Sequence, residues 1–396
     1  MKICFLLGSG FPVPAIKGGA IETLLEMIIE AKQNTNDNLE ISVITKKSDA
    51  VDYSRFNKIE FIFVPRLYII FEKIYWKFYG FFKKVFNIEL VAPLSRIFER
   101  NYVKKNFANF DYLIEETSLN IYKNTAIPKD KIIYHLHYGG EKEFCNDQLF
   151  GNLIAISDYI KSNWVKNTGR DLQDTFVLKN CIDINRFSKS LSVTHTEKMK
   201  IMSQIGIPEG NKVIIYVGRI IPEKGVLELI KAFNKIKYNK VSLLLIGSAS
   251  FSKKTMTDYE MEVQDQIHLS DKQIITTGFI HNSELYKYHA VADLAVIPSI
   301  WQEPAGLVEL EFQAAGVPII ATRVGGIPEF VSKKCKLVDA ENLIDNLTST
   351  IDKIINDDRE LKLMRDEGIA FSKTFNKQNY YIEFLNIINT IYERDQ

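Results

Sequence analysis

The chain has 396 residues, of which 46% are hydrophobic and 25% charged, and its formal net charge is +1 at pH 7. This length exceeds what one hydrophobic core usually supports, so two domains are expected. The near-neutral charge excludes a globally basic nucleic-acid-binding protein, and the lack of any run of eighteen apolar residues excludes a membrane-spanning helix.

The first ten residues, MKICFLLGSG, run directly into a strand-like segment and lack the long apolar core of a signal peptide. The four cysteines are scattered and form no CxxC pair, which is the pattern of reduced thiols rather than of a disulfide framework. A cytoplasmic location is therefore expected.

Short apolar runs alternate with helical patterns along most of the chain. The runs are rich in β-branched and aliphatic residues and apolar on both faces, as is typical of parallel strands covered by helices. The predicted strands are residues 3–7, 41–45, 60–64, 112–114, 132–136, 153–156 and 176–178 in the first half, and 213–217, 241–246, 274–276, 294–297 and 319–322 in the second. The predicted fold class is α/β, with two Rossmann-like, doubly wound parallel sheets whose ligand crevices lie at the carboxyl ends of the strands.

The polar, serine-rich stretch 188–196 is the expected linker. It gives domains of residues 1–194 and 195–374, and an active site is expected in the cleft between them. Residues 375–396 carry aromatic and aliphatic side chains at helical spacing and are expected to form a final helix.

A glycine-rich loop follows the first predicted strand. Gly8 and Gly10 begin it, but Val13 stands where a dinucleotide-binding fingerprint needs its third glycine, so no nicotinamide cofactor is expected. Further on, Gly18 and Gly19 permit a close backbone approach, with amides directed at a ligand. The alternative is an ordinary turn.

Residues 66–107 contain nine Lys or Arg against three Glu, together with twelve aromatic residues. A cationic helix with aromatic side chains can lie on an anionic membrane surface, and each basic residue contributes about 1 kcal/mol there. The alternative is that the aromatic side chains belong to the core of the first domain and the lysines are only solvated. Nucleic acid is not an expected partner, because no recognised motif accompanies this patch.

The fifth predicted strand ends in His135-Leu136-His137. Residues two apart share one face of a strand, so both histidines can be structural. His137 lies nearer the carboxyl end, where ligands gather in open sheets, and is the candidate for a catalytic role. After the next strand, Ser157 is a good helix N-cap, two residues before Tyr159.

In the second half, Arg219 and Lys224 lie in the segment GRIIPEKG, directly after the first strand. Arginine with its fork and lysine as a point charge can converge on one anion, whereas the alternative is a pair of ordinary surface residues. The sequence contains no Asp-x-Asp and no His/Cys cluster with ligand spacing. No metal is therefore expected, and these cations and helix amides would take its place.

The segment EPAGLVELE places Glu303 and Glu311 eight residues apart. Pro304 fits the first turn of a helix, and Gly306 leaves the backbone bare at a helix N-terminus, which suits a phosphate. Glu303 is then expected at the mouth of that site, and Glu311 about two turns (roughly 12 Å) further along. The alternative is an amphipathic helix with solvated glutamates, and Glu309 is expected to be a residue of that kind.

This segment resembles the E-x7-E signature of the retaining glycosyltransferases of family four, which adopt the GT-B fold, and the later GGIPE resembles the GGxPE sequence of that family. The resemblance implies that Glu303 contacts the donor sugar and that Glu311 binds the nucleotide ribose. Other matches are to the family's GR-x4-KG motif, GGxE loop, active-site histidine and SxY segment. They imply diphosphate binding by Arg219 and Lys224, donor contacts from Gly18, Gly19, Ala305 (where the family commonly has Phe), Gly306 and Leu307, sugar contact by His137, and acceptor-side positions at Ser157 and Tyr159.

The resemblance covers nearly the whole chain and implies an acceptor-side first domain and a second domain that binds the nucleotide sugar. In GT-B proteins the terminal helix, here 375–396, often crosses back onto the first domain, although it can also pack on its own domain. The implied reaction is the metal-independent, retaining transfer of a hexose, with no cofactor besides the donor. The donor would be a UDP-sugar, and the acceptor a hydroxyl of a glycan or lipid-linked molecule in polysaccharide or cell-envelope biosynthesis.

Two other functions are compatible with this pattern. The first is a nucleotide-sugar epimerase of the same fold, which needs no acceptor. The second is a non-catalytic family member that binds a nucleotide or a glycan. In each case the expected location is the cytoplasm, with peripheral contact to the inner face of the membrane through 66–107.

Overall fold

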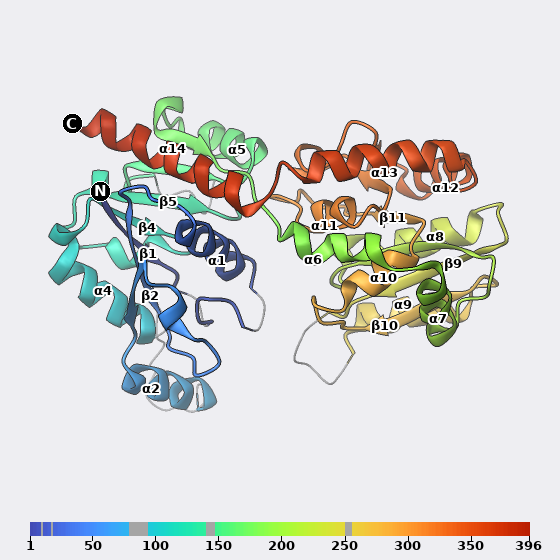
Figure 1. Ribbon diagram of the computed structural model, residues 1–396, viewed down its shortest axis with the longest axis horizontal. Helices are drawn as coiled ribbons and strands as arrows, with labels where there is room; N and C mark the ends of the chain where they lie inside the picture. Colours follow the sequence, from blue (N-terminus) through green and yellow to red (C-terminus); the bar gives the residue numbers. More distant parts are fainter. Residues whose placement is uncertain (9–10, 17–18, 79–93, 140–146, 250–255) are drawn as a thin grey trace. The chain divides into compact units, whose positions relative to one another are not determined.

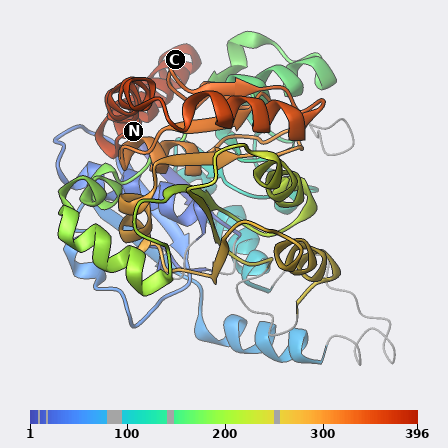
Figure 2. The same cartoon turned by 90° about the vertical axis from the view of Figure 1, so that its right-hand side faces the viewer.

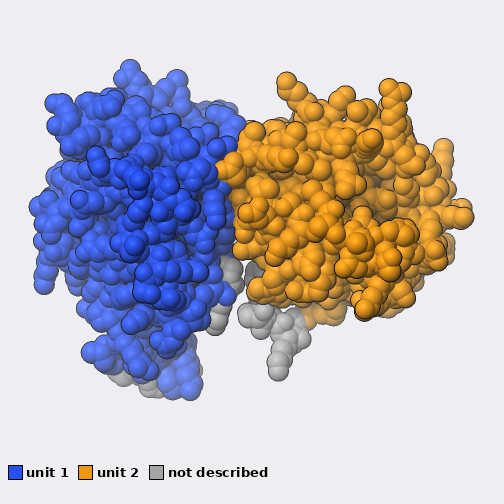
Figure 3. Space-filling view, viewed as in Figure 1, with its two compact units in different colours: residues 1–179, 377–396 blue, residues 180–376 orange. Residues whose placement is uncertain are grey.

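The computed structural model describes residues 1–8, 11–16, 19–78, 94–139, 147–249 and 256–396. The chain divides into two compact units, which Figure 3 colours separately. Unit 1 comprises residues 1–179 and 377–396, and unit 2 comprises residues 180–376. Each unit contains one parallel sheet covered by helices, which confirms the predicted α/β class with two doubly wound domains (Figure 1).

Unit 1 contains a seven-stranded parallel sheet in the order β3-β2-β1-β4-β5-β6-β7. Its strands are β1 (Lys2–Leu6), β2 (Glu40–Thr45), β3 (Ile59–Phe63), β4 (Tyr112–Glu115), β5 (Ile132–Leu136), β6 (Asn152–Ala155) and β7 (Thr175–Val177). Its α-helices are α1 (Ala20–Gln33), α2 (Arg66–Lys77), α4 (Leu94–Asn106), α5 (Asp158–Thr168) and α14 (Lys377–Asp395), and its 3₁₀ helices are η1 (Tyr53–Arg55), η2 (Phe107–Asn109), η3 (Leu119–Tyr122), η4 (Lys129–Lys131) and η6 (Leu172–Asp174). The strand order reverses between β1 and β4, which makes this point the topological switch of the sheet.

Unit 2 contains a six-stranded parallel sheet in the order β10-β9-β8-β11-β12-β13. Its strands are β8 (Lys212–Val217), β9 (Val241–Ile246), β10 (Ile274–Gly278), β11 (Leu294–Ile297), β12 (Ile319–Thr322) and β13 (Lys336–Val338). Its α-helices are α6 (Ile184–Ser188), α7 (His195–Ile205), α8 (Val226–Lys235), α9 (Asp258–His268), α10 (Leu285–Val291), α11 (Val308–Ala314), α12 (Leu343–Ile354) and α13 (Asp358–Ser372), with 3₁₀ helices η7 (Lys189–Ser192), η8 (Pro222–Lys224) and η9 (Ile327–Glu329). Here the order reverses between β8 and β11.

Alternating residues of the unit 2 strands enter two separate cores, one on each face of the sheet. Ile214 and Leu243 pack with α8 and α12, whereas Val213 and Leu244 pack with α7 and α11. Figure 2 shows helices on both faces of this sheet. Because both faces are buried, the strands read as continuous apolar runs, and this is why the sequence predicted them.

The twelve predicted strands all correspond to strands of the structure, with ends that differ by at most two residues. The prediction missed β13, a three-residue strand whose first two residues are only half-buried. Such a short run carries too little periodicity to be distinguished from a loop.

The predicted linker 188–196 is wrong. The segment contains η7 and the start of α7. Thr194 and Glu197 form a capping box at the N-terminus of α7. Ser190 is buried, and its Oγ donates to the carbonyl oxygen of Ala315, 2.8 Å away in unit 2. The division between the units consequently falls after residue 179, earlier than the predicted 194, because α6 and η7 pack on unit 2.

The last helix, α14, belongs to unit 1, where it packs along α1. The hydroxyl of Tyr381 donates to Asp37, 2.9 Å away, and Phe384 and Ile388 are buried. Within the described ranges, no helix is long and apolar enough to cross a membrane.

Candidate functional site

Residues predicted from the sequence follow both strands at the switch point of unit 2, whereas in unit 1 the predicted His137 follows β5, the neighbour of the switch strand β4. In unit 2, β8 ends one residue before the segment that carries Arg219 and Lys224, and β11 ends six residues before Glu303. In unit 1, β5 ends one residue before His137. Ligands of open α/β sheets bind beyond the carboxyl ends of the strands, so each unit has its own candidate site, and the two are described separately below.

Gly225 holds the loop after β8 against the loop after β11. Its φ of +67° ends η8 and starts α8, and a Cβ there would lie 2.0 Å from the carbonyl oxygen of Pro298. The N–H of Ile300 also donates to the carbonyl oxygen of Glu223 over 3.0 Å. Only glycine allows this approach, which places Lys224 beside the second loop.

Lys224 and Glu303 form an ion pair between Nζ and Oε1. Ser299 Oγ donates to the same oxygen over 2.7 Å, and both Ser299 and Glu303 are buried. The sequence had selected Lys224 and Glu303 independently, and the structure brings them together. Ser299 was missed, because a serine after a strand has no distinctive pattern.

The backbone of Glu303 is held by the glycine pair that follows β12. The N–H of Gly326 donates to the carbonyl oxygen of Glu303 over 2.7 Å, and the N–H of Gly325 donates to the side chain of Gln302 over 2.7 Å. Gly325 has a φ of +53°, and a Cβ there would lie 2.1 Å from the carbonyl oxygen of Glu303. The GGIPE segment therefore positions one of the candidate site residues.

Arg219 differs from Lys224 in its surroundings. Its side chain is exposed, and none of the described residues forms an ion pair with its guanidinium. Its carbonyl oxygen accepts a hydrogen bond from the hydroxyl of Tyr216 over 2.6 Å, which fixes the turn at the end of β8. The guanidinium is thus available to an anion at this edge of the sheet.

The predicted helix start at Pro304 is wrong, because α11 begins only at Val308. The bonds from the glycine pair hold Glu303 in a non-helical path, so the helix starts later. Between these points, Gly306 is buried, whereas Ala305 and Leu307 are half-buried and pack on the core of unit 2.

Glu309 is buried, so the prediction that it is solvated is also wrong. Its carboxyl folds back against Gly306, where an added Cβ would lie 1.7 Å from Oε2. Burial, with a further contribution from the charge of Glu303, raises the pKa of Glu309 to about 7. Burial also raises the pKa of Glu311 to about 8, with the charge of Glu309 as a second cause. No described residue hydrogen-bonds the carboxyl of Glu311, which leaves it able to accept from a ligand hydroxyl.

The candidate site of unit 1 begins with the loop before α1. Gly19 precedes this helix with a φ of +114°, and the carboxylate of Glu22 lies against it, 2.1 Å from where a Cβ would stand. The predicted partner Gly18 lies outside the described residues. After β6, Ser157 is buried and caps α5, because its Oγ accepts the N–H of Ile160 over 3.1 Å; Tyr159 is half-buried in the first turn.

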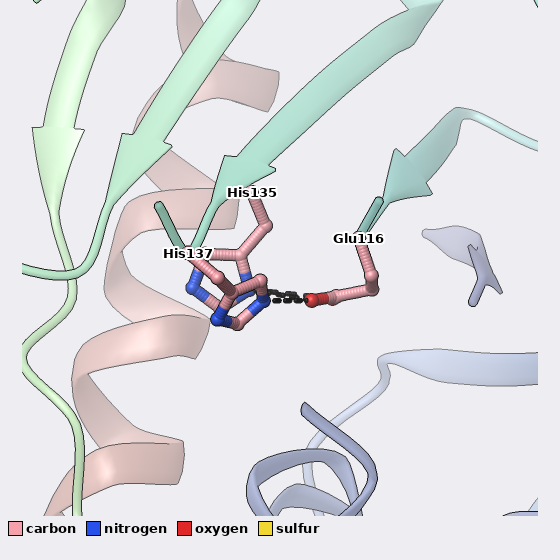
Figure 4. Close-up of side chains that lie close together, drawn as sticks. All are labelled: Glu116, His135 and His137. Atoms are coloured by element: carbon pink, nitrogen blue, oxygen red, sulfur yellow. Dashed lines mark hydrogen bonds and ion pairs between the residues drawn. The ribbon is translucent and has the colours of Figure 1, made fainter. Parts of the chain in front are cut away.

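Glu116, one residue beyond β4, joins the two histidines at the end of β5 (Figure 4). Its Oε2 lies 3.0 Å from Nδ1 of His135 and 2.5 Å from Nε2 of His137. Burial acts to raise the pKa of Glu116, but the charge of His135 and the hydrogen bonds of both histidines outweigh it and lower that pKa to about 2. Burial and the charge of His135 lower the pKa of His137.

These three side chains are also the group that could hold a metal ion in the described part of the chain, with ligand atoms within 4.8 Å of one another. Atoms that bind a tetrahedral zinc ion about 2.1 Å away lie about 3.4 Å apart. The separation of 2.5 Å between Glu116 and His137 is instead that of a hydrogen bond. The observed arrangement is therefore a carboxylate that accepts two imidazole N–H groups.

Glu116 was missed by the sequence analysis, because its partners lie on another strand. A signal was present: the run DYLIEE ends a buried strand with two consecutive acids, Glu115 and Glu116. Glu115 faces the other way and accepts from Arg96 over 2.9 Å. Consecutive strand residues alternate between faces, so two acids at this position serve two different sites.

Comparison with known protein families gives a match in the second half of the chain. Residues 197–370 match the family model described as glycosyl transferases group 1. The uncharacterized glycosyltransferase MJ1607 of Methanocaldococcus jannaschii is 31% identical over 57% of this chain and 55% of its own length. The lipopolysaccharide 1,2-N-acetylglucosaminetransferase of Salmonella typhimurium is 23% identical over 90% of this chain and 88% of its own length.

Solved structures show the same fold over the full length. The crystal structure of Anabaena Alr3699/HepE in complex with UDP and glucose covers 98% of this chain and 100% of that one, with a TM-score of 0.70 and 20% identity. At this identity the likeness establishes the arrangement of the sheets and helices, whereas the chemistry has to be argued from the side chains.

Proposed function

We propose that this chain is a group 1 glycosyltransferase that transfers a hexose, with retention of configuration, from a UDP-sugar to a hydroxyl of a glycan or lipid-linked acceptor. The observation that carries the proposal is the Lys224–Glu303–Ser299 cluster at the switch point of unit 2. The Salmonella relative acts on lipopolysaccharide, and the Anabaena structure holds UDP and glucose, which supports a UDP donor and a role in polysaccharide or cell-envelope synthesis.

Unit 2 would bind the donor. Lys224 and the exposed Arg219 would neutralise the diphosphate, Glu303 would contact the sugar, and Glu311 would accept from the ribose hydroxyls. Departure of the nucleoside diphosphate adds negative charge to its terminal phosphate, so fixed cations stabilise the transition state more than the ground state. The loop of Ala305, Gly306 and Leu307 would line the donor site between the two glutamates.

Unit 1 would supply the acceptor side, with Ser157 and Tyr159 near the acceptor and His137 in contact with the donor sugar. Retention would follow from attack on the face that the diphosphate leaves, with the departing phosphate accepting the proton of the acceptor hydroxyl. The protein then provides positioning and charge stabilisation without a separate general base or a metal ion.

The donor is tested by the thermal midpoint of the purified protein with UDP-, GDP- and ADP-sugars. A UDP-sugar at about 100 times its Kd should add about 2.7 kcal/mol, or roughly 5–10 °C for a unit of this size. Turnover should release UDP, leave the anomeric configuration unchanged by NMR, and persist with EDTA. The proposal fails if no nucleotide sugar shifts the midpoint, if the product is inverted, or if the sugar is only isomerised.

Helix α2 supports the proposed contact with a membrane. Its apolar residues at helical spacing are exposed, including Leu67 at 66% and Phe71 at 58%, together with Ile70, Ile74 and Phe78. Arg66, Lys73 and Lys77 are also exposed on the helix, while the carboxylate of Glu72 is paired with Lys46. Of the other aromatic residues in 66–107, Tyr75 is buried and Trp76 exposed, whereas Tyr79, Phe81, Phe82 and Phe86 lie outside the described residues.

An exposed apolar stripe flanked by lysines fits the surface of an anionic bilayer. We expect the protein to co-sediment with vesicles that contain phosphatidylglycerol and to bind less to vesicles of phosphatidylcholine alone. The double variant Leu67→Gln/Phe71→Gln should reduce sedimentation by about tenfold or more, because it removes two apolar side chains that would be buried in the bilayer. Leu269→Gln, which changes a leucine of unit 2 that is exposed even more than Leu67, is the control. Equal binding of both variants would contradict a role for α2.

A further inference from the structure

The buried Glu116 has a fixed place at the end of β4. Its N–H donates to the carbonyl oxygen of Leu6 over 3.0 Å, which ties it to β1 on one side. On the other side, the β4–β5 register continued by one residue places it beside His135. Figure 4 shows its carboxylate directed at both imidazole rings, which come from the neighbouring strand. The carboxylate is thus held at a defined position relative to His137.

The proton positions follow from the chemistry of these groups. A carboxylate is only an acceptor, so each imidazole nitrogen that faces it must carry the hydrogen. Glu116 is ionised, because its pKa is lowered to about 2, and His137 is neutral at neutral pH, because burial lowers its pKa. Neutral His137 therefore carries its hydrogen on Nε2, and Nδ1 has a lone pair.

The two outer nitrogens of the cluster differ in their surroundings. Nε2 of His135 is buried and has no hydrogen-bond partner. No described residue hydrogen-bonds Nδ1 of His137, and 7% of the His137 side chain is exposed. His137 also lies beyond the last residue of β5, at the edge of the sheet where ligands bind. Its lone pair is consequently the one that can reach a ligand.

From this arrangement we propose that Glu116 is the positioning residue of His137: it fixes the orientation of the ring and its Nε2–H tautomer, so that Nδ1 accepts a hydrogen bond from a hydroxyl of the donor sugar. The role rests on the proposed function, in which His137 contacts that sugar. His135 is the second donor to Glu116 and stabilises the buried negative charge.

The same contact explains why the tautomer matters. A neutral imidazole without its carboxylate can turn over or move its hydrogen to Nδ1, and it would then present a donor where the sugar needs an acceptor. Loss of the correct tautomer in a histidine–carboxylate pair can reduce catalysis strongly even when the geometry is kept. The effect expected here falls on turnover more than on binding of the nucleotide, which unit 2 would hold.

The test combines NMR of the ring nitrogens with kinetics. In the free wild-type protein, Nε2 of His137 should show a protonated-type and Nδ1 an unprotonated-type ¹⁵N signal. Glu116→Leu, which removes the acceptor, should lose this preference and lower kcat by about 100-fold with little change in KM for the donor. Glu116→Gln keeps one acceptor oxygen and should be intermediate. In a His137→Ala background, Glu116→Leu should cause no further loss.

Glu115→Gln is the control, because it changes the adjacent buried carboxylate that faces Arg96, and it should leave the His137 signals unchanged. If Glu116→Leu does not fold, the signals and kinetics of Glu116→Gln decide. A hydrogen on Nδ1 in the wild-type protein would overturn the proposal. So would stoichiometric metal in the purified protein that is lost from Glu116→Gln. If no nucleotide sugar reacts, the proposed function fails, whereas the NMR result still tests the positioning of His137.

Discussion

Replacing Lys224 with methionine is expected to lower kcat/KM for the nucleotide-sugar donor by about 10²- to 10³-fold. Methionine keeps most of the length of the side chain and removes the charge that would neutralise the departing diphosphate. A single group that stabilises charge developing in a transition state contributes an effect of this size. The measurement is initial-rate kinetics of UDP release, at fixed acceptor, for the wild-type and variant proteins.

Glu303→Gln should produce a loss of similar size, because it removes the carboxylate that would contact the sugar. The side chains of Lys224 and Glu303 touch, so their effects should not multiply in the double variant. Lys235→Met is the matched control: Lys235 is an exposed lysine of the same unit, paired with Asp345 over 2.9 Å. Exposed pairs of this kind contribute little, so its kinetics should equal those of the wild-type protein. Unchanged kcat/KM in the Lys224 variant would remove this residue from the donor site.

Gly325→Ala is expected to abolish most of the activity although residue 325 touches no substrate in the proposed mechanism. The new Cβ would lie 2.1 Å from the carbonyl oxygen and 2.5 Å from the nitrogen of Glu303. The backbone of Glu303 must therefore move, and its carboxylate moves away from Lys224 and Ser299. A displacement of about 1 Å in a positioning group can cost about 100-fold in rate. Initial rates and the thermal midpoint, measured together, test this expectation.

Gly210→Ala is the control that separates backbone strain at a positive φ from the steric collision with Glu303. Gly210 also has a positive φ, +84°, but nothing lies within 4 Å of the position of its Cβ. Both alanines impose backbone strain of about 1 kcal/mol, and only Gly325→Ala adds the collision with Glu303. We expect Gly210→Ala to lower the thermal midpoint slightly and to leave kcat unchanged. Equal kinetics for the two variants would show that Gly325 does not control the position of Glu303.

The sequence predicted the sheets well because parallel strands are buried on both faces. Each strand then appears as a short, continuous apolar run, and a helix between two runs fixes the parallel direction. The sequence also predicted Lys224, Glu303 and His137 as site residues, because each lies in a segment that resembles a motif of the family and follows a strand, at the edge where ligands bind. Lys224 and Glu303 are 79 positions apart in the sequence, so only the folded structure shows that their side chains form an ion pair.

What the sequence could not predict depends on contacts between distant segments. The start of α11 was placed too early, because bonds from Gly325 and Gly326 override the local preference of Pro304 for a helix start. The sequence predicted a solvated Glu309, because helical spacing alone does not show that its carboxyl folds back against Gly306. Glu116 was overlooked because its histidine partners are supplied by a neighbouring strand.

The course of the chain through its two units has a consequence for biosynthesis. Unit 2 is inserted into unit 1, since residues 180–376 are followed by twenty residues that return to the first unit. Those residues include Phe384, whose ring centroid lies 5.6 Å from that of Phe5, and Asp395, which accepts from the hydroxyl of Tyr112 over 2.5 Å. During translation, the inserted unit has left the ribosome before this closing helix emerges. Unit 1 is therefore the first unit to be synthesised, but it completes its fold only when α14 has emerged. Until then, the apolar surface of unit 1 that α14 covers has to be shielded.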